Sequence, residues 1–128
     1  SCASRQVVDF VNWLKAQPFY ENTTIVIVGD HLTMDSDFCQ DVPEDYTRGV
    51  YNTIINAPIV PVNQKNRMAT TMDMFPTTLA ALGVQIDGNR LGLGTNLFSG
   101  QKTLPEKLGR GYINQELKKN DKEYNGFY

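Results

Sequence analysis

The sequence is poor in the residues that metal sites and disulfide frameworks use. Its 128 residues include a single histidine, His31, and two cysteines, Cys2 and Cys39. The cysteines lack a metal-ligand spacing, so they can form one disulfide or remain two thiols, and they do not fix the redox compartment. Without a second histidine, any zinc-type or manganese-type site needs carboxylates or residues from elsewhere.

Long apolar runs and an excess of one charge are also missing. No run approaches the roughly 20 apolar residues of a membrane-spanning helix, and no signal peptide is visible. The formal net charge of −2 gives no reason to expect nucleic acid as a partner. With 41% apolar and 20% charged residues, the composition is that of a soluble globular domain, or of part of one.

The hydrophobic pattern predicts an α/β order of elements. A nucleophile turn of the G-x-S-x-G type is absent, so the pattern alone assigns no catalytic hydroxyl. Apolar spacing, capping residues and turn signals divide the chain as follows: helix 4–17, strand 24–28, acidic surface loop 32–48, strand 50–56, helix 70–82, extended segment 84–86, glycine-rich segment 90–97, a last helix beginning near 103 and a polar tail at 118–128 that is expected to fray.

Two of the predicted helices carry an apolar stripe and a capping signal. Thr70 and Asp73 have capping-box spacing, as do Thr103 and Glu106. The side chains expected to face the core are Met72, Phe75, Leu79 and Leu82 in the first of these helices and Leu108, Tyr112 and Leu117 in the second.

The strongest candidate for chemistry follows the run Ile25–Val28. This β-branched run predicts a buried strand, and Gly29, Asp30 and His31 follow it directly. The end of such a strand is where α/β sheets present functional groups. Asp30 and His31 are a candidate metal-binding or acid/base pair, and Gly29 is expected to ease the turn that brings both to one ion. The alternative is an aspartate that caps a loop beside a hydrogen-bonded histidine.

Other motifs favour structural roles. Asp35 and Asp37 begin like a calcium loop, but the required glycine is missing, so a solvated loop is the better interpretation. The segment 90–94 has no third glycine and is not a dinucleotide fingerprint. Arg48 and Arg67 are long enough to reach a phosphate, yet single arginines are usually surface residues.

Three segments, in order, resemble the alkaline phosphatase/sulfatase superfamily. The segment 23–34 with Asp30 and His31 is similar to its last metal-binding segment, 71–83 to its T-x-D-x-x-P-T helix, and 90–100 to the G-L-G segment of phosphoglycerol transferases. The resemblance covers roughly residues 4 to 108 and is greatest to membrane-anchored phosphoglycerol transferases and lipoteichoic acid synthases.

The resemblance implies a fold and a partial site. Residues 1–128 would be one C-terminal fragment of a larger sulfatase-like catalytic domain, a partial alkaline-phosphatase-like sandwich with helices on a mostly parallel sheet. A divalent metal, Mn²⁺ before Mg²⁺ or Zn²⁺, would be held by Asp30, His31, a glutamate and a nucleophilic threonine. The glutamate and the threonine would lie upstream, so this chain carries no catalytic nucleophile, and substrate-binding residues remain unassigned.

The implied reaction moves phosphoglycerol from a phosphatidylglycerol-type lipid to a cell-envelope glycan or polyol. The parent protein would work at the extracytoplasmic face of a bacterial membrane, anchored by upstream spans, whereas the fragment itself would be soluble and, without the nucleophile, inactive. A sulfatase or phosphodiesterase of the same superfamily, and a non-catalytic module, remain alternatives. With part of the sheet missing, the fragment is expected to expose a strand edge through which it can self-associate.

Overall fold

The computed structural model describes residues 2–63 and 65–119. The chain divides into two compact units, Ser1–Pro58 and Ile59–Tyr128. Both combine helices with a small two-stranded antiparallel sheet, so the α/β class is confirmed in its general form. The expected mostly parallel sheet is not confirmed, because both strand pairs in the described ranges are antiparallel. The tail predicted at 118–128 lies almost wholly outside the described residues.

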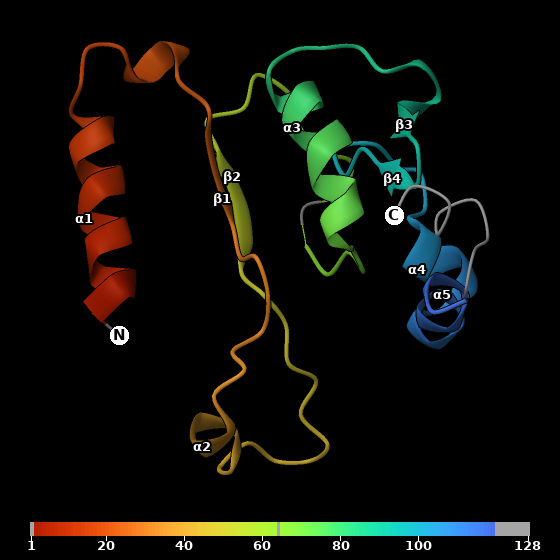
Figure 1. Ribbon diagram of the computed structural model, residues 1–128. Coiled ribbons are helices and arrows are strands. Elements are labelled where there is room, and N and C mark those ends of the chain that lie inside the picture. The colour runs from red at the N-terminus through yellow and green to blue at the C-terminus, as the bar shows by residue number, and fades with distance from the viewer. Residues whose placement is uncertain (1, 64, 120–128) are drawn as a thin grey trace, which may run out of the picture. The chain divides into compact units, whose positions relative to one another are not determined.

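The first unit is a helix, a strand pair and a long loop between the strands (Figure 1). Its elements are α1 (Cys2–Lys15), the 3-10 helix η1 (Tyr20–Asn22), β1 (Ile25–Val28), α2 (Ser36–Cys39) and β2 (Asn52–Ile55). The loop predicted at 32–48 therefore contains one helical turn. Asp35 begins this turn, because its carboxylate accepts the backbone N–H groups of Asp37 and Phe38.

Strand β1 pairs with β2 in a fixed register. Ile25 lies opposite Ile55 and Val28 opposite Asn52. The side chain of Asn56, which has a φ of 60°, donates to the carbonyls of Tyr20 and Thr23 and ties the end of β2 to the chain before β1. The prediction that β1 is fully buried was wrong: the strand is half-buried, and Val28 is 40% exposed, because within its unit β1 pairs with a single strand.

Helix α1 is amphipathic but only partly covered. It ends at Lys15, shortly before the predicted end, and Val11 is its one buried residue. Phe10 and Trp13 stack with ring centroids 5.8 Å apart, and both are more than half exposed. Together with half-buried β1, the helix gives this unit an unusually apolar surface.

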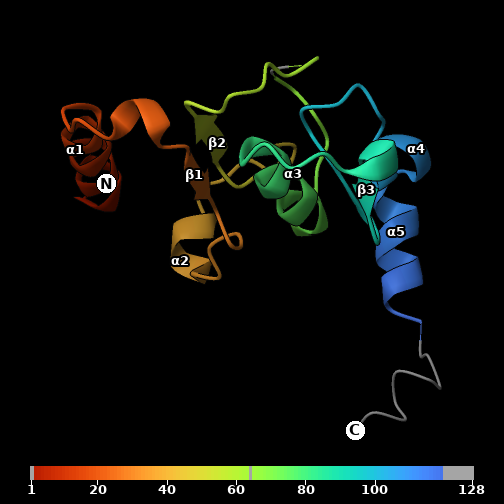
Figure 2. The ribbon, with the colours of Figure 1, turned by 90° about the horizontal axis from the view of Figure 1, so that it is seen from above.

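The second unit is built on helix α3 and a β-hairpin (Figure 2). The 3-10 helix η2 (Thr71–Asp73) leads into α3 (Met74–Ala81), and η3 (Asp87–Asn89) leads into the hairpin of β3 (Arg90–Leu91) and β4 (Gly94–Thr95). The glycine-rich segment is thus a tight hairpin. Helices α4 (Leu104–Leu108) and α5 (Arg110–Leu117) replace the single predicted last helix, because Gly109 takes a φ of 81° between them.

The core of the second unit consists mainly of small and polar residues. Asp73 is 1% exposed, and its carboxylate accepts the N–H and hydroxyl of Thr70 and, at 2.8 Å, the N–H of Thr95. The hydroxyl of Thr77 donates to the carbonyl of Asp73 and accepts the N–H of Leu97 at 3.0 Å. One face of α3 therefore binds the strand β4 through hydrogen bonds rather than through large apolar side chains.

The predicted apolar stripes face this core only in part: Met72 and Leu79 are half-buried. Phe75 and Leu82 are 64% and 68% exposed. In α3 the buried positions are Pro76, Thr77, Ala80 and Ala81. In the last helices the buried residues are Pro105 and Ile113, whereas Leu108, Tyr112 and Leu117 are half exposed or more. Small residues occupy the inner face of α3 because β4 lies too close to the helix for large side chains.

Arg67 ties helix α4 to the segment that precedes it. Its guanidinium makes a bidentate ion pair with Glu106, at 2.7 and 2.9 Å, and donates to the carbonyls of Ser99 and Gln101. The carboxylate of Glu106 also accepts the N–H of Thr103, which completes the predicted capping box of α4. The interpretation of Arg67 as a surface residue was therefore wrong, since its side chain is only 11% exposed.

Replacing Gly94 with alanine tests the close approach of β4 to α3. A Cβ atom at this position would overlap the backbone carbonyl of Met72, and a clash with backbone cannot be relieved by a rotamer change. We expect Gly94→Ala to cost about 3 kcal/mol or more, measured by denaturant unfolding. Gly100→Ala is the control, because its Cβ would lie 3.5 Å from Val62; equal costs for the two variants would contradict this packing.

The Arg67–Glu106 pair predicts a specific dependence of stability on pH. The hydrogen bond from Arg67 lowers the pKa of Glu106 from 4.5 to about 2. Because the pKa is lower in the folded state, the pair stabilises fully above about pH 5, and this stabilisation is lost as the pH falls towards 2. We expect Glu106→Gln to cost about 2–3 kcal/mol at neutral pH and to flatten the acid limb of the stability profile.

A matched control for this pair lies on α5. Glu116 pairs with Lys119 at 2.6 Å, but both side chains are exposed, at 40% and 67%. Exposed pairs contribute little, so Glu116→Gln should leave the profile between pH 5 and 2 unchanged. A profile that changes equally in both variants would show that burial at Arg67 does not matter.

Candidate metal centre and the pocket beside it

Gly29 places the candidate site at the end of β1. Its N–H donates to the carbonyl of Tyr51 at 2.9 Å, so the pairing with the β2 side continues one residue beyond the strand. A Cβ at this position would lie 2.8 Å from the Cβ of Val50. The glycine is therefore required for close approach of the two chain segments. Gly29 does not take a positive φ, so the close approach of Val50 gives this position a need for glycine beyond the turn expected from the sequence.

Asp30 and His31 converge on each other. One carboxylate oxygen of Asp30, Oδ1, accepts the backbone N–H of His31 at 2.8 Å, and the other, Oδ2, lies 3.3 Å from Nε2 of His31. The side chains are 86% and 61% exposed, respectively. Adjacent residues of a regular strand would point to opposite faces, so the chain has left the strand geometry at this point. Both side chains can reach the same ligand from solvent.

The local hydrogen bonds prepare both side chains as ligands. The backbone N–H of His31, followed by that of Asp30 itself and by the imidazole, holds the pKa of the Asp30 carboxyl below its ordinary value. The carboxylate is therefore charged at neutral pH. Nδ1 of His31 lies 2.8 Å from the carbonyl of Leu32. When Nδ1 carries the proton and donates it to that carbonyl, Nε2 presents its lone pair, which is the arrangement found in metal-binding histidines.

The distance between the two donor atoms fits a shared metal ion. Ligands at 2.0–2.2 Å from one ion lie about 2.8–3.6 Å apart for octahedral to tetrahedral angles. The separation of 3.3 Å between Oδ2 and Nε2 falls within this range. An anionic oxygen with an imidazole nitrogen suits manganese, magnesium or zinc. The same distance also suits a direct ion pair.

Among the described residues, no further ligand lies beside this pair. In residues 2–63 and 65–119 no three His, Cys, Asp or Glu side chains gather closely enough to hold a metal ion. Cys2 and Cys39 are both free thiols. Cys39 instead accepts a hydrogen bond from Arg48. The assignment of Asp30 and His31 as ligands therefore stays a prediction of a two-ligand partial site.

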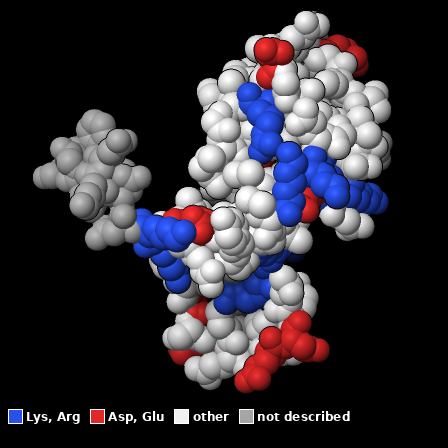
Figure 3. Space-filling model, turned by 90° about the vertical axis from the view of Figure 1, so that its right-hand side faces the viewer, with Lys and Arg blue, Asp and Glu red and all other residues white. Residues whose placement is uncertain are grey.

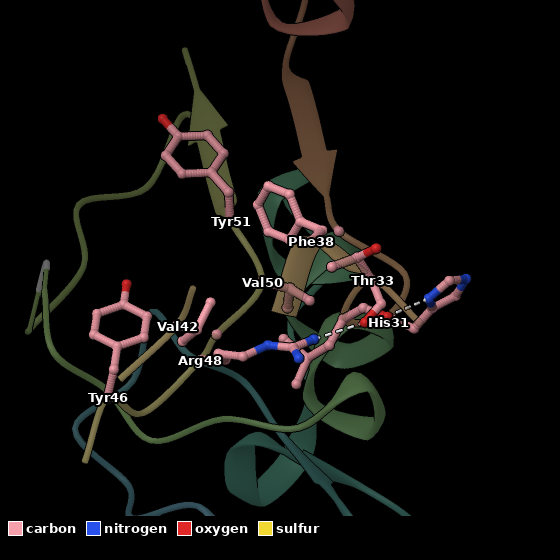
Figure 4. A pocket seen from close by; sticks show the side chains of 11 residues that line it. His31, Thr33, Phe38, Val42, Tyr46, Arg48, Val50 and Tyr51 are labelled. Atoms are coloured by element: carbon pink, nitrogen blue, oxygen red, sulfur yellow. Dashed lines mark hydrogen bonds between the residues drawn. The ribbon is translucent and has the colours of Figure 1, made fainter. Parts of the chain in front are cut away.

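A pocket opens beside His31, within the first unit (Figure 4). It measures about 380 Å³ and lies between the chain that leaves β1 and the chain that enters β2. Phe38, Tyr46 and Tyr51 contribute aromatic rings to its lining. Sequence analysis missed this pocket, since its residues are spread over 23 positions, from 29 to 51, and only the strand pairing brings the two ends of the loop together.

Arg48 fixes the walls of this pocket. Its two terminal nitrogens donate at 2.7 Å, one to the sulfur of Cys39 on α2 and one to the carbonyl of Thr33. The guanidinium thus joins both halves of the loop. Asn52, the other residue near the strand end, accepts the N–H of Gly29 through its side chain. Both residues therefore have structural contacts here.

The two other motifs of the sequence form a structural core rather than a site. In the second unit, Asp73 and Thr77 of the T-x-D-x-x-P-T helix bind the backbone of Thr95 and Leu97, which lie in the G-L-G segment. The two motifs therefore belong together, a link that their separation in sequence does not reveal. Over the face seen in Figure 3, basic and acidic side chains are interspersed among uncharged ones.

Comparison with known proteins identifies relatives. Proteins named phosphoglycerol transferase I from Citrobacter koseri and Salmonella choleraesuis are 30% identical over 104 and 101 residues, and one from Escherichia coli is 31% identical over 104 residues. Each match covers 79% of this chain and 13% of the relative. No protein-family model and no solved structure matches the chain. None of the helices in the described ranges is long and apolar enough to cross a membrane.

These matches agree with the resemblance drawn from the motifs. They extend over most of the chain, and they carry one name in every relative compared. The small share of the relatives that is covered is consistent with a C-terminal part. The chain is therefore homologous to a segment, about an eighth of the length, of the proteins named phosphoglycerol transferase I.

Proposed function

We propose that this chain provides two metal ligands, Asp30 and His31, to a phosphoglycerol transferase. The observation that carries the proposal is the convergence of Oδ2 and Nε2, 3.3 Å apart, at the end of a strand. The names of the relatives support the reaction class. The chain spans 13% of their length, so the remaining ligands, a glutamate and a nucleophilic threonine, would come from the rest of such a protein.

Each of the two residues has a definite task in this proposal. Asp30 supplies an anionic oxygen that stays charged to acid pH, and His31 supplies a neutral nitrogen whose orientation is set by the carbonyl of Leu32. A divalent ion bound there, Mn²⁺ or otherwise Mg²⁺ or Zn²⁺, would supply stabilisation of the negative charge on a transferred phosphoryl group. Gly29 keeps both ligands beside the β2 segment through its bond to Tyr51.

The proposed substrates follow from the same family. The donor would be a phosphatidylglycerol-type lipid and the acceptor a hydroxyl of an envelope glycan or polyol. A lipid donor and an envelope acceptor place the reaction at the extracytoplasmic face of a bacterial membrane, to which the whole protein would be anchored. Nucleic acid is not expected as a partner, in keeping with the net charge of −2.

The surface of the first unit supports a place within a larger, sulfatase-like domain. Each strand of a two-stranded sheet has one unpaired edge, and β1 is only half-buried. We propose that further, mostly parallel strands complete this sheet in the whole protein, as in an alkaline-phosphatase-like sandwich. The isolated chain would use the same edge to associate with a second copy.

A non-catalytic module is the second candidate. It is favoured by the fact that the described part of the chain brings only two ligands together. In that case the 3.3 Å contact is an ion pair of protonated His31 with Asp30, and metal is not needed. Metal content separates the two candidates, because only the first requires both side chains for binding.

The proposal predicts that both ligands are needed for metal and for transfer. In the intact protein, Asp30→Ala and His31→Ala should each reduce bound metal, measured by elemental analysis, and lower transfer from labelled phosphatidylglycerol by about 100-fold or more. Both side chains are exposed, so folding should be unaffected. Asp41→Ala, an exposed carboxylate of the same loop, is the control and should retain metal and activity.

Two results would contradict parts of this account. Full metal content and full activity in His31→Ala would remove the ligand assignment. Release of free glycerol phosphate in place of a glycan-linked product, with acceptor present, would make the protein a hydrolase of the same superfamily, using water in place of a glycan.

A further inference from the structure

Three aromatic side chains surround the pocket beside His31. Phe38 of α2 is 66% exposed, and Tyr46 and Tyr51, which precede β2, are 64% and 72% exposed. A single exposed ring on a protein surface needs no explanation. Three rings around one concavity form an exposed apolar patch of the kind that marks binding sites. The volume of about 380 Å³ is also in the range of small-molecule sites.

The charges of the pocket point to an uncharged ligand. No Lys, Asp or Glu side chain is among the residues that line it, and Arg48 is the one residue there with a permanent charge. Both terminal nitrogens of Arg48 already donate, to Cys39 and to Thr33. A phosphate would meet no cluster of cations in this pocket. The one guanidinium there already donates from both terminal nitrogens to protein acceptors, which disfavours a bidentate contact with phosphate. The recognition surface is therefore made of rings and phenolic hydroxyls.

The composition of the lining also distinguishes a sugar from an acyl chain. A pyranose ring has an apolar C–H face and a rim of hydroxyls. Tyrosine matches both, because its ring packs against the apolar face and its hydroxyl donates and accepts at the rim. An acyl chain would gain nothing from the phenolic hydroxyls of Tyr46 and Tyr51 and would leave them without partners. Figure 4 shows the two tyrosines on the side of the pocket away from His31.

We propose that this pocket binds a sugar ring of the glycan that accepts the phosphoglycerol group, with Tyr46 and Tyr51 as its contact residues. This inference rests on the proposed function, which supplies the reaction, whereas the pocket supplies the location of the acceptor. His31 lines the same pocket, so a hydroxyl of the bound ring lies next to the candidate metal ligands. Arg48 acts as a positioning residue, since it holds the loop that carries Tyr46.

The test measures glycan binding and donor consumption separately in the intact protein. The probe is a short, uncharged glucose oligosaccharide, titrated by calorimetry. Tyr46→Ala and Tyr51→Ala should each weaken binding about 10-fold or more, which is about 1.4 kcal/mol or more, because each removes a ring that packs against the apolar face of the sugar. Tyr51→Phe, which keeps the ring, should lose less than Tyr51→Ala. Tyr112→Ala, a half-exposed tyrosine of the second unit, should bind normally.

Donor consumption keeps the two proposals distinguishable. If the oligosaccharide KM rises in both alanine variants and the KM for phosphatidylglycerol does not, the pocket is the acceptor site. Unchanged oligosaccharide affinity in both variants would overturn the inference. A pocket that binds a detergent-solubilised acyl lipid but no glucose oligosaccharide would also overturn it. Failure of the wild-type protein to consume the donor would instead refute the proposed function, whatever the binding result.

Discussion

The second unit depends on one buried carboxylate. Asp73 is 1% exposed, and an unpaired charge at such a position would be strongly destabilising. One of its oxygens caps the start of η2 and α3 through Thr70, and the other holds the N–H of Thr95. These bonds require β4 to lie against the helix, which in turn requires a glycine at 94 and small residues at 77, 80 and 81. The packing of the hairpin against α3 follows from satisfying this group.

The sequence predicted the local structure of this unit better than it predicted how the unit packs. Both capping boxes were predicted from spacing, because capping depends on residues only three positions apart. The inner face of α3 was predicted wrongly, because apolar periodicity assumes that large side chains face the core. Here a hydrogen-bonded strand displaces them, and Phe75 and Leu82 turn outwards. The role of Arg67 was missed for a similar reason, since its partner Glu106 lies 39 residues away.

The candidate site shows the same division between local and long-range information. The adjacency of Asp30 and His31 at the end of an apolar strand was visible in the sequence, and the structure brings the two side chains together at 3.3 Å. The reason for Gly29 was not visible, because it depends on Val50 and Tyr51 across the loop. The aromatic pocket was invisible for the same reason, although its residues all lie between 29 and 51.

The proposed metal centre requires that Asp30 and His31 bind the same divalent ion in the protein to which this segment belongs. The most direct measurement is an anomalous-difference map from crystals of the intact protein grown with Mn²⁺. The account predicts one strong peak within about 2.2 Å of both Oδ2 of Asp30 and Nε2 of His31, with His31 Nδ1 still bonded to the carbonyl of Leu32. A manganese peak elsewhere, with the Asp30–His31 ion pair intact, would contradict it.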